Sequence, residues 1–210
     1  MILPGMCLAS ALGAHRPKHL VETPRSAAVV LVLVNRPRLG PALLLTRRHA
    51  GMRNYANDWC LPGGRRDSED ASLLACAWRE LREETGINPL PSALLAELDD
   101  FYDGKGELVR PFVCQLSEAS LRTSLSLQTD ETSEWMLLPF SDLFRVERDS
   151  EGQTAARRQP AYLLELKNGQ GLVWGLTASI LRHFLNVLTG SDSPLCKGER
   201  FHTKECTNEQ

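Results

Sequence analysis

Apolar runs broken by turn-forming residues predict a chain of strands mixed with two main helices. β-Branched and aliphatic residues fill 26–34 and 41–46, and the turn between these segments contains Pro and Gly, so both are predicted strands. The same pattern predicts further strands over 94–102, 109–116, 134–138, 161–166 and 171–173. A short helix is predicted after Pro139.

The segment 70–85 has the three-and-four spacing of an amphipathic helix. Asp70 is suited to act as its N-cap, and Gly86 stands where a left-handed residue ends a helix. A last helix is predicted over 176–188. Strands mixed with two such helices predict an α/β/α sandwich around a mixed β-sheet. The apolar stripe of the first helix consists of Leu73, Leu74, Ala77, Trp78 and Leu81.

Acidic residues gather on one face of this predicted helix. Glu80, Glu83 and Glu84 are related by steps of three and four and therefore share a face, although like charges at that spacing cost ~0.2–0.5 kcal/mol per pair. A solvated face with ion pairs is one explanation. The glycine loop at 61–64 directly precedes the helix and lets a backbone carbonyl approach a ligand. Oxygen donors from loop and helix together favour a site for a hard cation such as Mg²⁺.

The stretch GGRRDSEDASLLACAWRELREETGI resembles the Nudix box. Its second half matches the box at every fixed position from Arg79 to Ile87. Its first half differs, because Asp70 stands where the box has Glu and the stretch from Gly64 to Arg79 is one residue longer. Some proteins similar to coenzyme A diphosphatases share this longer form with an aspartate.

The resemblance implies a pyrophosphohydrolase that uses Mg²⁺ or Mn²⁺ and an active site built on the box. The implied metal ligands are Gly64, Asp70, Glu80, Glu83 and Glu84. The residues implied in catalysis are Arg79, Glu80, Glu83 and Glu131. Arg79 is expected to orient the carboxylates, and a box glutamate or a later acid is expected to take the proton from water. Glu131 occupies the place of a loop glutamate that faces the site in similar enzymes, and an exposed loop acid is the alternative.

The stretch LLTRRHAGMRNYANDWCLPGG follows the motif that precedes the box in coenzyme A diphosphatases. Arg48 and Arg53 match that motif and are the implied substrate-binding residues. His49, Asn57 and Leu61 replace its Ser, Gly and Phe. Asn is a mild substitute for Gly where a positive φ is needed.

The likeness extends from about residue 26 to 188, because VWGLTA at 173–178 resembles a segment that opens the last helix of the same subfamily. The function favoured is hydrolysis of coenzyme A or an acyl-CoA to 3′,5′-ADP and 4′-phosphopantetheine or its acyl derivative. A Nudix hydrolase of ADP-ribose or a dinucleotide and a catalytically silent Nudix-like binding module are the alternatives. The expected partner is a small-molecule nucleotide substrate, and a homodimer is also considered.

Composition and charge exclude other classes of protein. The chain has 210 residues, 42% of them hydrophobic, which suffices for a core. Its net charge of −2 argues against nucleic-acid binding, and no run reaches the ~20 apolar residues of a membrane span. The six cysteines are scattered, and Cys76 and Cys114 lie in apolar runs, so reduced core thiols in a cytosolic protein are expected. Trp78 and Trp174 are also expected in the core.

The predicted organisation has three parts. Residues 1–24 form an N-terminal extension, which is apolar at first but has no basic segment ahead of that stretch, so secretion is not expected. Residues 25–190 form the Nudix domain. Residues 191–210 are polar and are predicted to be a disordered tail.

Overall fold

The computed structural model describes residues 8–37, 39–52, 55–126, 132–140, 142–143, 161–166 and 169–190. The strands of its main sheet are β1 (Ala27–Asn35), β2 (Ala42–Arg48), β3 (Trp59–Cys60), β4 (Gly63–Arg65), β5 (Leu94–Glu97), β6 (Phe101–Tyr102), β7 (Leu108–Ser117) and β8 (Thr132–Pro139). A separate hairpin consists of β9 (Ala161–Leu166) and β10 (Gly169–Trp174). The helices are α1 (Leu8–Ala14), α2 (Leu73–Thr85), the 3₁₀ helix η1 (Pro91–Ala93), α3 (Glu118–Ser124) and α5 (Gly175–Thr189).

The main sheet is mixed and open, with the strand order β3-β2-β1-β7-β5. β1 and β7 run parallel, from Ala27 opposite Val109 to Asn35 opposite Ser117. The other pairings of this sheet are antiparallel, and β4, β6 and β8 add to β1, β7 and β2 respectively. β1 is therefore the strand that connects the glycine loop to the rest of the sheet.

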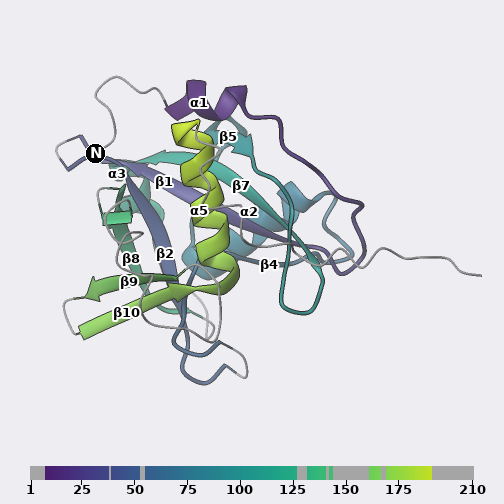
Figure 1. Cartoon of the computed structure of the whole chain (residues 1–210). Coiled ribbons are helices and arrows are strands. Elements are labelled where there is room, and N and C mark those ends of the chain that lie inside the picture. Colours follow the sequence, from purple (N-terminus) through teal and green to yellow (C-terminus); the bar gives the residue numbers. More distant parts are fainter. Residues whose placement is uncertain are drawn as a thin grey trace, which may run out of the picture.

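Alternating side chains of β1 divide the core into two layers. Leu31 and Leu33 belong to the cluster that α1 and α5 cover, whereas Val30 and Val32 belong to the cluster that α2 covers. Figure 1 shows α5 in front of the sheet, with α1 near its upper end, and α2 behind the sheet. The predicted α/β/α sandwich with a mixed sheet is confirmed.

The box helix begins later than the pattern predicts. Ser72 is its N-cap, and its side chain accepts a hydrogen bond from the Ala75 amide at 3.1 Å. The expectation that Asp70 caps the helix is wrong, because its carboxylate accepts from the Asp67 amide and from an arginine instead. Gly86 ends the helix at φ 73°, as predicted. Within the predicted stripe, Leu73, Ala77 and Leu81 are buried, while Leu74 and Trp78 are half-buried.

The single strand predicted over 94–102 is divided into β5 and β6. Pro111 of β7 lies opposite the interruption and has no N–H to donate, so the ladder cannot continue there. The Leu98 amide still donates to the Pro111 carbonyl at 3.0 Å. Asp99 and Asp100 leave the ladder and accept hydrogen bonds from backbone amides of the N-terminal segment. The interruption thus gives the sheet edge two carboxylates.

The described part of the N-terminal extension packs on the domain. Leu12 of α1 is 1% exposed and belongs to the same cluster as α5. Glu22 accepts from Arg110 at 2.6 Å, and Arg110 forms two 2.8 Å bonds with the fully buried Asp100 side chain. The boundary near residue 24 stays a prediction, and residues 191–210 lie outside the described residues.

The remaining expectations concern thiols, membranes and the last elements. Cys76 and Cys114 are buried free thiols, as expected, and Cys60 is partly buried.

Among the described residues, no helix is both long and apolar enough to span a bilayer. The strands predicted at 161–166 and 171–173 and the last helix are confirmed, whereas the helix expected after Pro139 falls largely outside the described residues. α1 and α3 were not predicted.

Candidate active site

Arg79 lies at the centre of the acidic face of α2. Its Nη1 donates to Oε1 of Glu80 at 2.8 Å and to Oε2 of Glu83 at 2.9 Å. Its Nε and Nη2 donate to the Asp70 carboxylate at 3.1 and 2.9 Å. The Asp70 contact is the main reason why the pKa of Arg79 is raised, and the same contact lowers the pKa of Asp70. The guanidinium therefore stays charged and fixes three carboxylates, those of Asp70, Glu80 and Glu83, by charge-assisted hydrogen bonds.

The three glutamates on this face differ in exposure. The Glu83 side chain is 47% exposed and the Glu80 side chain is 18% exposed. Glu84, taken as a whole residue, is 6% exposed. The sequence groups these residues correctly on one face, and the structure arranges them from solvent to interior. A cation that enters from solvent therefore meets Glu83 before it meets Glu84.

The glycine loop touches this face directly. A Cβ atom at Gly64 would lie 2.6 and 2.7 Å from the two carboxylate oxygens of Glu80, so the carboxylate rests on the Gly64 backbone. Gly63 has φ +147°, and a Cβ there would lie 2.3 Å from the Ala28 carbonyl oxygen. The Gly64 backbone and the Glu80 carboxylate thus meet at this point, and both carry oxygen donors. This all-oxygen donor set fits a hard divalent cation such as Mg²⁺ or Mn²⁺.

Asp70 lies beneath Arg79, apart from the open part of the face. The residue is 7% exposed, and its Oδ2 accepts from the Asp67 amide at 2.8 Å as well as from Arg79. Those donors use its oxygens, so the geometry favours an orienting role, and metal ligation by Asp70 stays a prediction. Arg66 holds the Asp70 carbonyl through bonds of 3.3 and 3.1 Å. Arg66 was not predicted as a site residue, although its place in the basic pair directly after the glycine loop marks it.

Arg48 and Glu84 both act electrostatically on the Cys60 thiol. The pKa of the Cys60 thiol reflects both groups: it is raised to about 11, mainly by burial and next by the Glu84 carboxylate, while the Arg48 guanidinium opposes the rise. Nε of Arg48 is buried and has no hydrogen-bond partner in the described part of the chain. Arg48 pairs with Thr132 across β2 and β8. Two other predicted site residues, Arg53 and Glu131, lie outside the described residues.

The loop that follows β2 is held in shape by its own backbone and by Trp174. Asn57 has φ 65°, which confirms that this position needs the conformation that glycine adopts easily. The Trp174 indole donates to Oδ2 of Asp58 at 3.1 Å, and its ring packs against Tyr55 with centroids 5.9 Å apart. Trp174 is half-buried, so the expectation of a core residue is wrong, because its polar N–H binds this loop. His49 is exposed and accepts from the Gly51 amide.

Comparisons with known proteins give consistent results. The NUDIX domain family model matches residues 23–159. The uncharacterized Nudix hydrolase NudL of Photorhabdus laumondii subsp. laumondii is 34% identical over 167 residues, which are 79% of this chain and 86% of that protein. The protein of the same name from Pectobacterium atrosepticum is 33% identical over 83% of this chain and 87% of its own length.

Solved structures are similar in fold. A MutT/nudix family protein from Enterococcus faecalis has a TM-score of 0.56 at 18% identity, over 83% of this chain and 66% of that chain. A mutT/nudix family protein from Listeria innocua has a TM-score of 0.50 at 17% identity, over 80% of this chain and 95% of that chain. At these identities the likeness concerns the sandwich fold.

Proposed function

The chain belongs to the Nudix family of pyrophosphohydrolases, and on that premise we propose that it hydrolyses the diphosphate linkage of coenzyme A or an acyl-CoA. The products are 3′,5′-ADP and 4′-phosphopantetheine or its acyl derivative. The reaction uses Mg²⁺ or Mn²⁺ at the acidic face of α2. The observation that carries the choice of substrate is the buried Nε of Arg48, a residue that acts on the same thiol as Glu84 of that face.

The residues of the acidic face have distinct roles in this proposal. Glu80, Glu83, Glu84 and the Gly64 carbonyl would hold the cation, which when bound stabilises negative charge on the phosphoryl oxygens. Arg79 positions Glu80 and Glu83 through its 2.8 and 2.9 Å bonds. Glu80 or Glu83 takes the proton from the attacking water, and Glu131 is the alternative base.

Arg48 gives the site a reason to prefer coenzyme A. A buried polar nitrogen that lacks a partner carries a desolvation cost, and an anionic ligand group would offset it. Coenzyme A differs from ADP-ribose and from dinucleotides by its 3′-phosphate, and a guanidinium can bind a phosphate through two parallel hydrogen bonds. We assign the 3′-phosphate to Arg48, together with Arg53 of the same motif.

Arginine variants and a pair of substrates test the assignment. Arg48→Ala and Arg53→Ala are expected to raise KM for coenzyme A about tenfold, or about 1.4 kcal/mol, and to affect 3′-dephospho-coenzyme A much less. Arg47→Ala is the matched control, because Arg47 is adjacent on β2 but pairs with Glu134 at 3.2 Å and lies over the Trp59 ring. This control is expected to leave the ratio of the two KM values unchanged.

The outcomes separate the candidate functions. Equal losses on both substrates would show that the arginines do not recognise the 3′-phosphate. A wild-type protein that prefers ADP-ribose or a dinucleotide would replace the substrate while keeping the reaction. A protein that turns over none of these substrates with Mg²⁺ or Mn²⁺ would be a silent binding module. Identifying the product pair by mass spectrometry establishes which bond is cleaved.

A further inference from the structure

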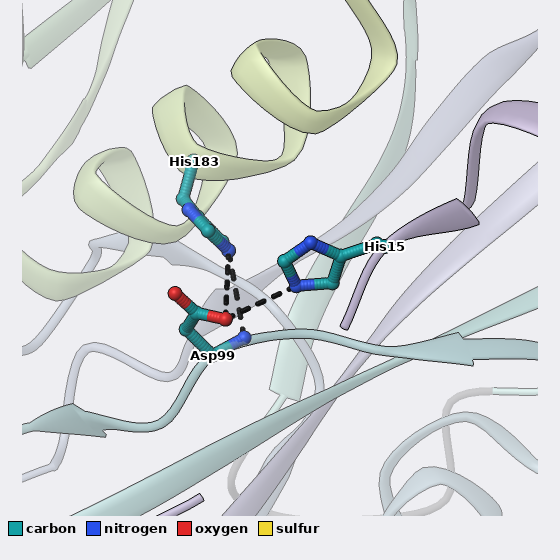
Figure 2. Close-up of side chains that lie close together, drawn as sticks. All are labelled: His15, Asp99 and His183. Atoms are coloured by element: carbon teal, nitrogen blue, oxygen red, sulfur yellow. Dashed lines mark hydrogen bonds and ion pairs between the residues drawn. The ribbon is translucent and has the colours of Figure 1, made fainter. Parts of the chain in front are cut away.

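Three side chains from distant segments converge at a second place in the molecule. His15 follows α1, Asp99 lies in the link between β5 and β6, and His183 lies on α5. Figure 2 shows the two imidazole rings and the carboxylate pointing toward one another. Nε2 of His15 lies 3.1 Å from Oδ1 of Asp99, and Nε2 of His183 lies 3.8 Å from the same oxygen. One ligand atom from each of the three residues lies within 4.8 Å of the other two.

We propose that His15, Asp99 and His183 bind a transition-metal ion of the Zn²⁺ class, and that this ion fastens the N-terminal segment to α5. Two imidazole nitrogens and a carboxylate oxygen are ligands that Zn²⁺ accepts. Tetrahedral bonds of about 2.0–2.1 Å separate neighbouring ligand atoms by about 3.3 Å. The two distances to Asp99 Oδ1, 3.1 and 3.8 Å, lie on either side of that value. The two histidine–carboxylate distances therefore fit a shared ion.

Nε2 of each histidine faces Asp99. The Asp99 amide donates to Nε2 of His183 at 3.4 Å, so this nitrogen is the unprotonated one of its ring, and a bound ion would take the place of this long hydrogen bond. Nε2 of His15 is buried and makes no hydrogen bond in the described part of the chain, although it faces the Asp99 carboxylate. A simple hydrogen-bonded histidine–aspartate pair would place a ring N–H in line with the carboxylate. A metal ion supplies the missing interaction for His15.

Surrounding contacts hold all three ligands in place before any ion binds. The Lys18 amide donates to Oδ1 of Asp99 at 2.9 Å. The His183 ring packs edge-on against His15 and Phe101, with centroid distances of 5.4 and 5.7 Å. Hydrogen bonds and packing of this kind orient metal ligands and raise affinity.

The cluster is separate from the acidic face of α2 and is reachable from solvent. It lies on the side of the sheet that α1 and α5 cover, whereas α2 covers the other side. His15 also lines a shallow cavity of about 350 Å³, together with Leu12, His19 and Glu97. The cavity thus leads from solvent to one residue of the cluster. The two sites also differ in chemistry, since an all-oxygen face suits Mg²⁺ and imidazoles suit Zn²⁺.

Metal titrations of the full chain test the proposal. Zn²⁺ binding by calorimetry and the visible spectrum of bound Co²⁺ are measured in excess Mg²⁺, so that the acidic face is occupied. The wild-type protein is expected to bind one equivalent, and His15→Gln and His183→Gln to bind at least about tenfold more weakly. His19→Gln is the matched control, because His19 lies in the same segment and faces Glu97 at 3.1 Å but is outside the cluster. This control is expected to bind as the wild type does.

Thermal unfolding tests the fastening role independently of catalysis. At a hundredfold excess over Kd, Zn²⁺ is expected to raise Tm by about 5–10 °C for the wild type and for His19→Gln. Little rise is expected for the two cluster variants. Their circular dichroism without metal shows whether they fold.

X-ray absorption of the Zn²⁺-loaded wild-type chain identifies the ligands without any variant. The proposal predicts nitrogen and oxygen neighbours at about 2.0–2.1 Å, whereas a cysteine site would show sulfur at about 2.3 Å. A sulfur shell, an absence of binding by the wild type, or unchanged affinity in both cluster variants would each overturn the proposal.

Discussion

Replacing Gly64 with alanine tests the contact between the glycine loop and the box helix. The added methyl would lie 2.5 Å from the Glu80 carboxyl carbon and 2.6 Å from its nearer oxygen. Since ordinary contacts begin at 3.4 Å, that oxygen has to move by about 0.8 Å. The obstacle is the end of a flexible side chain, so the carboxylate can move while the backbone stays in place.

Gly64→Ala is expected to lower the catalytic rate much more than it lowers stability. Misplacing a catalytic group by about 1 Å lowers rates about 10²-fold, which corresponds to about 2.7 kcal/mol of transition-state stabilisation. The free energy of unfolding is expected to change by less than about 1 kcal/mol, and Tm by less than about 4 °C. The variant should therefore be folded and nearly inactive in coenzyme A hydrolysis, with weaker activation by Mg²⁺.

Gly63→Ala is the structural counterpart, and Gly104→Ala is the control. A methyl at Gly63 would meet the Ala28 carbonyl at 2.3 Å and Val29 Cα at 2.6 Å, with φ at +147°. Backbone strain and overpacking each cost about 1–3 kcal/mol, so Tm should fall by at least about 5 °C. At Gly104 the nearest atom is the Tyr55 hydroxyl at 3.7 Å, so neither Tm nor rate should change.

Differential scanning fluorimetry and initial rates on coenzyme A separate these outcomes. A Gly64→Ala protein with wild-type kcat/KM would refute the placement of Glu80 against Gly64 as a requirement for catalysis. A loss of stability equal to that of Gly63→Ala would instead give Gly64 a structural role.

Three further predictions concern the acidic face. Removing divalent ions with a chelator should abolish turnover, and Mg²⁺ or Mn²⁺ should restore it; full activity in chelator would exclude metal-dependent hydrolysis. Glu83→Gln and Glu84→Gln should each lower kcat at least ~10²-fold with the circular dichroism spectrum unchanged, and near-normal turnover in both would make these acids an ordinary exposed face. Asp70→Asn should cost about 2 kcal/mol of stability at neutral pH, because charged hydrogen bonds to a buried carboxylate are lost. Folding lowers the Asp70 pKa, so the difference in Tm between the wild type and Asp70→Asn should be complete above about pH 5 and should shrink as pH falls below about 4. A difference in Tm that does not depend on pH would contradict this.

Local patterns predicted much of the fold and the grouping of the acidic residues. Periodicity alone puts Glu80 and Glu84 on one face, because residues four apart on a helix are neighbours whatever surrounds them. The resemblance supplied Gly64, whose contact with Glu80 depends on how β4 packs against α2. The helix face and the box motif could be predicted because each is determined by residues that lie close together in the sequence.

Other features depend on neighbours that are distant in sequence. The break between β5 and β6 follows from Pro111 on the adjacent strand, which no pattern within 94–102 reveals. Ser72 rather than Asp70 caps α2 because Arg79, nine residues after Asp70, binds its carboxylate. α1 has only seven residues, so its periodicity is weak, and its packing against α5 is what defines it.

A chain of charged contacts connects the N-terminal segment with the box. Glu22 accepts from Arg110 at 2.6 Å through one oxygen and from Arg66 at 3.2 Å through the other. Arg66 in turn holds the carbonyl of Asp70, whose carboxylate binds Arg79. Each of these bonds fixes a group that takes part in the next, so Glu22, Arg66, Asp70 and Arg79 form one continuous network. This network links the box arginine to a residue that precedes the box by more than forty positions, so the N-terminal segment contacts the structure around the candidate site.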